Sequence, residues 1–172
     1  MLNNPSRHIA LDVETTGLSP RSGRVIEIGA VMIDNGRLTD EFSSLIRIDR
    51  KIPRQAQCIH GISDEMLAGE RTAGEVLPLL LDFLEDSTIV AHNARFDMAF
   101  LRQEFERISV RLKNRAVCTL KMSKAIYPGL SNHRLDTVYR HLFGEIDKDI
   151  RRHRALDDAR MAARIWMEMV KR

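Results

Sequence analysis

The stretch His8-Ile9-Ala10-Leu11-Asp12-Val13-Glu14 reads as a β-strand and sets the plan of the chain. Residues two apart on a strand share a face and lie ~6.6 Å apart along it. The apolar residues at 9, 11 and 13 therefore face one way, and Asp12 and Glu14 face the other. Neighbouring carboxylates repel and raise each other's pKa unless a cation lies between them. This pair therefore indicates a cation site, although a solvated strand face is the simpler alternative.

The segments on either side of this strand, which we place at residues 8–13, predict an α/β domain. Residues 24–34 and 37–48 are β-rich runs joined by Asp34-Asn35-Gly36, and an Asn-Gly pair is typical of a tight hairpin. Two short strands are predicted at 88–91 and 115–118. Helices are predicted at 63–67 (capped by Ser63), 73–85 (where Pro78 should kink the helix or mark its first turn), 94–107, 119–126, 134–142 and 154–171. This order indicates a mixed β-sheet flanked by helices, in a single domain over residues 1–172.

Charge is unevenly distributed along the chain. The net charge is +3, and residues 111–172 hold 15 Lys and Arg against 7 Asp and Glu, whereas residues 1–110 hold 12 against 17. A basic C-terminal third suits an anionic polymer partner, and a merely solvated basic surface explains it about as well. We expect phosphate contacts from the arginines of this segment, with Arg151 and Arg154 as the first candidates: Arg134, Arg140, Arg151, Arg152 and Arg154.

Targeting signals and a disulfide framework are not visible in the sequence. Cys58 and Cys118 are the only cysteines, and their spacing suits neither a metal site nor a set of disulfides. Met1–His8 lacks the apolar core of a signal peptide, and the most apolar stretch, Val76–Leu84, is too short to span a membrane. The sequence therefore predicts a cytoplasmic protein with no membrane partner.

A third carboxylate, Asp97, leads the apolar stripe of the helix at 94–107. Positions 97, 101, 105 and 108 share one helical face and read Asp, Leu, Phe and Ile. Burying a carboxylate at the edge of a core costs several kcal/mol unless a charge partner or a metal is present. The alternative is a helix N-terminal charge that the helix dipole favours.

The segment His153-Arg154-Ala155-Leu156-Asp157-Asp158 supplies a fourth carboxylate and a histidine. Asp158 borders the apolar stripe of the last helix, whereas Asp157 lies on a mostly polar face and is expected to point to solvent. His153 lies about 140° around an ideal helix from Asp158. If both serve one site, His153 must lie on the loop that enters the helix.

Together these segments offer four inward carboxylates and one histidine. Oxygen ligands select hard cations such as Mg²⁺ or Mn²⁺ over zinc. Two such ions, ~3.5–4 Å apart, can activate a water and stabilise the leaving oxygen in phosphodiester cleavage. An imidazole can take the proton of that water near neutral pH.

Three stretches, Leu11–Gly17, His92–Asp97 and His153–Asp158, resemble in order and separation the three exonuclease motifs of the DEDD superfamily. The histidine of the third motif is similar to that of the DEDDh, or DnaQ-like, branch, and the resemblance is closest to the epsilon type of proofreading exonuclease. It implies a ribonuclease H-like fold, two Mg²⁺ or Mn²⁺ ions and 3′–5′ hydrolysis to 5′-mononucleotides. The implied metal ligands are Asp12, Glu14, Asp97 and Asp158, with His153 as the general base.

The resemblance also implies substrate-binding positions and partners. The substrate positions are Thr15, Thr16, Gly17, Leu18, His60, Gly61, Asn93 and Phe96, and for the last four a fold-supporting role is about equally expected. The implied partners are a single-stranded DNA 3′ end and a DNA polymerase subunit, although the chain ends at Arg172, where the epsilon type continues into a polymerase-docking tail. Two alternatives stay open: a 3′–5′ exoribonuclease of the oligoribonuclease or ribonuclease T kind, and a non-catalytic nucleic-acid-binding or polymerase-adaptor module.

Overall fold

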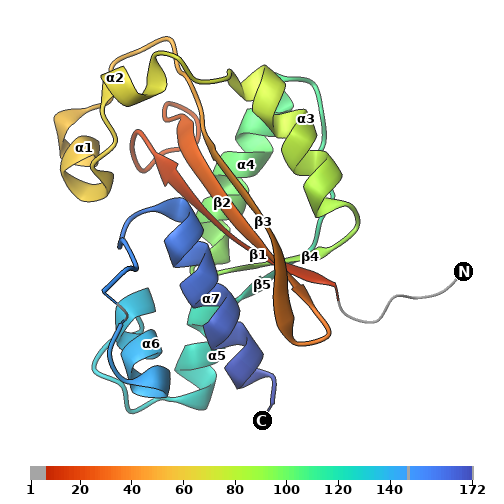
Figure 1. Cartoon of the computed structure of the whole chain (residues 1–172), viewed down its shortest axis with the longest axis vertical. Helices are drawn as coiled ribbons and strands as arrows, with labels where there is room; N and C mark the ends of the chain where they lie inside the picture. The colour runs from red at the N-terminus through yellow and green to blue at the C-terminus, as the bar shows by residue number, and fades with distance from the viewer. Residues whose placement is uncertain (1–6, 147, 172) are drawn as a thin grey trace, which may run out of the picture.

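A five-stranded mixed sheet forms the centre of the computed structural model, which describes residues 7–146 and 148–171 (Figure 1). The central strand β1 (His8–Thr15) pairs antiparallel with β2 (Val25–Asp34) and parallel with β4 (Thr88–Ala91). The edge strands are β3 (Arg37–Leu45), antiparallel to β2, and β5 (Ala116–Cys118), parallel to β4. The order is thus β3-β2-β1-β4-β5, and the predicted mixed sheet is confirmed.

Helices cover both faces of this sheet (Figure 1). Helices α3 (Ala73–Leu84) and α4 (Ala94–Arg107) pack on the face to which Ile9, Leu11 and Val13 point. Helix α7 (Ala155–Met169) covers the opposite face, where its Ala163 and Trp166 share a core with Ala10 of β1. Because side chains alternate along a strand, Asp12 and Glu14 lie on the α7 side with Ala10.

The remaining helices form two groups. Helices α5 (Thr119–Ile126) and α6 (Leu135–Phe143) pack beside α7 around a second apolar core. Helices α1 (Arg54–His60) and α2 (Asp64–Leu67) lie together at one end of the sheet, away from α5 and α6 (Figure 1). Ser63 caps α2, as predicted, by accepting a hydrogen bond from the Met66 N–H at 3.4 Å.

One helix was not predicted, and the structure decides between the two alternatives for Pro78. Helix α1 was not predicted, because its seven residues bury only Ala56 and His60 and show no apolar stripe. Pro78 lies inside α3 rather than in its first turn; it lacks the N–H that would bond to the carbonyl of Gly74, and it is exposed. The hairpin turn is as predicted, with positive φ at both Asn35 (49°) and Gly36 (72°).

No described helix combines the length and the apolar content that crossing a membrane requires. The prediction that Met1–His8 carries no signal peptide concerns a segment whose first six residues lie outside the described part of the chain, as do positions 147 and 172.

Candidate active site

Two acidic residues of β1 lie opposite a glycine and a glutamate of β2. Asp12 pairs with Gly29 and Glu14 with Glu27 in the antiparallel register. Directly opposed residues on antiparallel strands place their side chains on the same face, which here is the face under α7. Asp12 is half-buried and Glu14 is buried, 9% exposed. The end of β1 therefore places two carboxyl groups beneath a helix.

Gly29 allows the first turn of α7 to reach the sheet. A Cβ at this position would lie only 2.1 Å from the backbone nitrogen of Leu156 and 2.2 Å from the carbonyl carbon of Ala155. Any side chain here would push the helix off β2. The absence of one brings the start of α7, and with it Asp158, over the acidic end of β1.

Asp158 and His153 meet Glu14 at this point. One possible ligand atom from each of the three side chains lies within 4.8 Å of the others. The His153 N–H donates to Asp158 Oδ2 at 3.2 Å, whereas Asp158 Oδ1 is buried and has no hydrogen-bond partner among the described residues. An oxygen-rich set with an unpartnered buried carboxylate oxygen fits a divalent cation.

His153 lies on the loop before α7, where it was expected if it shares a site with Asp158. The helix begins at Ala155, and His153 adopts a left-handed backbone conformation with φ 60°. Its side chain is exposed, so the imidazole stands in contact with water at the rim of the acidic cluster, which is formed by Asp12, Glu14 and Asp158.

Asp97 joins the cluster from the first turn of α4. It is 3% exposed, and the backbone N–H of Val13 donates to its carboxylate across the end of β1. Asn93, which precedes the helix, has φ 78° in the left-handed region. The structure thus brings together the four carboxylates and the histidine that were predicted from three separate segments.

The pKa values of all four acids are raised, because the site disfavours their negatively charged forms. Burial first, and then the charges of Asp97, Asp158 and Glu14, raise the pKa of Asp12 well above its usual value. Burial and the charge of Asp158 raise the pKa of Glu14 to about 8. Burial raises the pKa of Asp97 to about 7 and also raises that of Asp158. Bound cations would remove this penalty.

We therefore expect the metal-free protein to lose stability as the pH rises. The pKa of Glu14 rises from its ordinary value of 4.5 to about 8 on folding, so this carboxyl binds more protons in the folded than in the unfolded state between these values. The free energy of unfolding then falls across that window, by about 2 kcal/mol between pH 6 and 8.5, or about 4–8 °C in Tm for a chain of this size. Calorimetry in EDTA checks this. A flat Tm, or a fall that Glu14→Gln leaves unchanged, would contradict it.

Glu27 and Arg154 form an ion pair beside the acidic cluster. Arg154 Nε and Nη2 donate to Glu27 Oε1 at 3.0 and 2.7 Å, and the Ala155 N–H donates to Glu27 Oε2 at 3.0 Å. Arg154 was predicted to contact phosphates, but Glu27, whose side chain is only 3% exposed, engages its guanidinium. Arg154 thus anchors the start of α7 to β2, and a phosphate contact from its half-buried side chain stays a prediction. Glu27 was not predicted as part of the site, although a glutamate inside the apolar run Val25–Ile28 was a visible signal.

Further contacts hold the loop that carries His153. Arg152 bonds to Asp136 of α6 at 2.9 Å, and the Arg151 N–H donates to Asp157 Oδ2 at 2.9 Å. Asp157 was expected to face solvent; this is wrong, because its side chain is 15% exposed and also pairs with Arg160. Arg152 and Arg140, both expected at phosphates, share Asp136. The side chains of Arg134 and Arg151 are exposed.

The residues predicted to bind substrate lie in different environments. Thr15 Oγ1 donates to the Gly17 carbonyl at 2.7 Å, and Leu18 is 87% exposed. His60 is buried near Glu27, Arg154 and His153. Gly61 ends α1 with φ 71°, Asn93 is exposed and Phe96 packs on Phe100.

The His60 ring has a single tautomer compatible with its contacts. Its Nδ1 accepts the Ile62 N–H at 3.0 Å, so the ring proton lies on Nε2. That nitrogen is buried and has no hydrogen-bond partner in the part of the chain that the structure describes. It is therefore available to donate to a ligand.

The mixed sheet, its helices on both faces and the carboxylates at the end of β1 define a ribonuclease H-like exonuclease fold. Exonuclease X in complex with 5′ overhanging duplex DNA has a TM-score of 0.79 at 27% identity, covering 95% of this chain and 91% of that one. The nuclease domain of 3′hExo, a DEDDh family member bound to rAMP, shares the fold with a TM-score of 0.81 at 19% identity, over 96% of this chain and 92% of that one.

Sequence comparison gives the family. The exonuclease family model matches residues 9–166, and the chain belongs to that family. It is 36% identical to DNA polymerase III subunit epsilon of Pasteurella multocida, over 98% of this chain and 70% of that protein. It is 43% identical to the PolC-type DNA polymerase III of Thermotoga maritima, over 95% of this chain but only 12% of that relative's length.

Proposed function

We propose that this protein is a metal-dependent 3′–5′ exonuclease that removes 5′-mononucleotides from the 3′ end of DNA, with single strands preferred. The observation that carries the proposal is the convergence of Glu14 and Asp158 on His153, within 4.8 Å, beside the half-buried Asp12 and the buried Asp97. Such a cluster is costly without cations and suited to phosphodiester chemistry with them.

Two Mg²⁺ or Mn²⁺ ions are the proposed cofactors, held by Asp12, Glu14, Asp97 and Asp158. Carboxylate oxygens favour these hard ions, and the unpartnered Oδ1 of Asp158 supports a ligand at that atom. When bound, such ions supply an activated water and neutralise the charge that develops on the phosphate.

Side chains of this protein would accept the proton of the water and bind the 3′ end of the nucleic acid. His153, exposed at the rim and beside Asp158, is positioned to accept the proton of the attacking water. The buried Nε2–H of His60 would donate to the terminal nucleotide. Thr15, Thr16, Gly17 and Leu18 would contact its sugar and base, and Asn93, Phe96 and Gly61 would complete the pocket.

DNA as substrate, and a DNA polymerase as partner, are supported by two relatives: a PolC-type DNA polymerase III and a DNA polymerase III subunit epsilon. A role in proofreading or repair and a cytoplasmic location are part of this proposal.

The test is a cleavage assay on 5′-labelled single-stranded DNA, mismatched duplex DNA and single-stranded RNA of matched sequence, each with Mg²⁺, Mn²⁺ or EDTA. We expect stepwise shortening of the DNA from its 3′ end with either ion, and none with EDTA. A 3′-terminal phosphorothioate linkage, as a control, should slow the first step. Faster digestion of RNA would move the assignment to an exoribonuclease, and tight binding without cleavage would favour a non-catalytic module.

Arg151 is the best remaining candidate for a phosphate contact near His153, because its side chain is exposed while Arg152 and Arg154 are paired. Losing one phosphate contact should reduce the slope of log K against log salt by about 0.7 for a single strand. We expect this change for Arg151→Ala in DNA binding measured by fluorescence anisotropy. Arg111→Ala serves as the control, because Arg111 lies beside Thr88 at the start of β4, the end remote from Asp97. Equal slopes for the two variants would refute the contact.

A further inference from the structure

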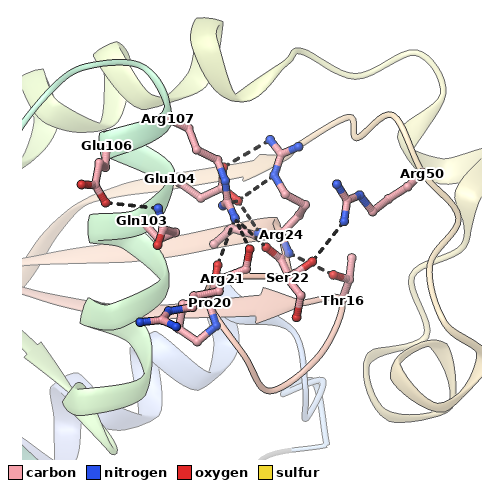
Figure 2. Close-up of polar contacts among 12 residues, drawn as sticks. Thr16, Pro20, Arg21, Ser22, Arg24, Arg50, Gln103, Glu104, Glu106 and Arg107 are labelled. Carbon is pink, nitrogen blue, oxygen red and sulfur yellow. Dashed lines mark hydrogen bonds and ion pairs between the residues drawn. The ribbon is translucent and has the colours of Figure 1, made fainter.

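A loop formed by residues 16–24 connects β1 to β2 and is held along its length by α4 (Figure 2). Arg107 Nη2 donates to the carbonyls of Pro20 at 3.0 Å, Arg21 at 3.3 Å and Gly23 at 3.2 Å. One guanidinium thus gathers three carbonyls of a loop that lies more than 80 residues away in sequence. Arg50 adds a fourth contact, to the Ser22 carbonyl at 3.0 Å.

Glu104 holds Arg107 in place and joins the loop to β2 (Figure 2). Its side chain is 1% exposed and accepts from Arg107 Nη1 at 2.8 Å and from Arg24 Nε at 2.9 Å. It also accepts the Val25 N–H at 3.1 Å, at the first residue of β2. A buried ion cluster of this kind is weak grounds for stability alone, because apolar residues of similar volume often serve as well. What the cluster does is hold Arg24, Val25 and Arg107 in one arrangement around Glu104.

The geometry that it fixes is that of the loop's start and end. The Thr16 N–H donates to the Arg24 carbonyl at 3.0 Å, and the Arg24 N–H donates to Thr16 Oγ1 at 2.9 Å. Gly23 packs against α4 so closely that a Cβ there would lie 2.9 Å from the ring of Phe100. The segment is therefore a braced turn.

Leu18 projects from this braced turn. Its side chain is 87% exposed, so it contributes little to the core. It follows Glu14 by four residues, and four residues span at most ~14 Å, which keeps Leu18 near the acidic cluster. A large apolar side chain held beside a polar site, but out of the core, is suited to contact a base.

We propose that Arg107 and Glu104 are positioning residues for the substrate's terminal nucleotide: they hold the 16–24 loop so that Leu18 meets the base at the 3′ end. This inference rests on the proposed exonuclease function and deepens it. Among the described residues, no hydrogen bond or ion pair of Arg107 or Glu104 reaches the four carboxylates or His153; they act through Leu18. Their effect should therefore appear in substrate binding rather than in the chemical step.

The test is a double-mutant cycle with Arg107→Met, Leu18→Ala and the double variant on single-stranded DNA. We expect Arg107→Met to raise KM about tenfold while kcat changes less than about threefold, because the carboxylates and His153 are untouched. In the Leu18→Ala background, the same substitution should leave KM nearly unchanged. Arg102→Met is the matched control: Arg102 is exposed on the same helix and, within the described residues, makes none of these loop contacts.

An equal rise in KM with and without Leu18, or a fall in kcat at constant KM, would overturn the proposal. Amide hydrogen exchange of residues 17–23 gives a second readout that needs no cleavage. Exchange should become faster in Arg107→Met and not in Arg102→Met, and unchanged exchange would also overturn the proposal. If Arg107→Met does not fold, Arg107→Lys, whose single ammonium cannot serve three carbonyls and Glu104 together, should give the same direction. Absence of cleavage by the native protein would instead refute the exonuclease function, and the exchange experiment would still decide whether Arg107 holds the loop.

Discussion

Asp12→Asn is expected to reduce cleavage of single-stranded DNA by about 10³-fold or more, because several kcal/mol of charge stabilisation depend on the cations that Asp12 would hold. The substitution keeps the shape of the side chain and removes one of the four charges that converge at the end of β1. The measurement is the rate of mononucleotide release at saturating Mg²⁺ and again at saturating Mn²⁺. Failure of excess metal to restore the rate would show that the charge itself is needed.

The same variant should be more stable than the native protein when no metal is present. Burial and the charges of Asp97 and Asp158 oppose ionisation of Asp12, so a neutral amide relieves the folded state of that cost. We expect a higher Tm in EDTA and a smaller rise in Tm on adding Mn²⁺. Asp40→Asn, on the exposed part of β3, is the control and should behave as the native protein. Near-native cleavage by Asp12→Asn would remove the basis of the proposed function.

His153→Ala is expected to lower kcat by about 10²–10⁴-fold, the usual contribution of a general base. The side chain is exposed, so its loss should leave Tm nearly unchanged. The chief structural contact of the residue, from its N–H to Asp158 Oδ2 at 3.2 Å, comes from the backbone and survives the substitution. The measurement is single-turnover cleavage across pH 6–9.

A fall in rate throughout this pH range, with Tm unchanged, is the expected result of losing a base at this position. His141→Ala, at another exposed histidine on α6, is the control and should retain the native profile. A rate within about threefold of native for His153→Ala would mean that another group accepts the proton.

Strand and helix periodicity predicted most of the elements and the inward direction of the acids. Alternation along β1 separated Asp12 and Glu14 from the core, and the face of the last helix selected Asp158, 7% exposed, over Asp157. These conclusions need only local geometry, because the period of an element tells which of its residues share a face. The catalytic roles of these residues stay predictions until cleavage is measured.

Sequence periodicity does not predict a very short helix, and it does not predict an ion pair whose two residues lie far apart along the chain. Helix α1 has too few buried residues to show a stripe. The basic segment at 151–154 gave no sign of the ion pair of Arg154, because no acidic partner for its guanidinium lies nearby in sequence. Its partner Glu27 lies 127 residues away.

The sequence by itself determined the mixed sheet, the order of the three acidic motifs and the face on which each acid lies, because these depend on spacing along one element. Only the tertiary structure decided that Gly29 admits the backbone of α7 to the sheet, that Glu27 engages Arg154, and that Glu104 and Arg107 brace the loop that carries Leu18. The physical reason is that packing and ion pairing join residues from elements far apart along the chain. A local sequence pattern can predict that a side chain points inward, but it cannot predict which residue that side chain contacts.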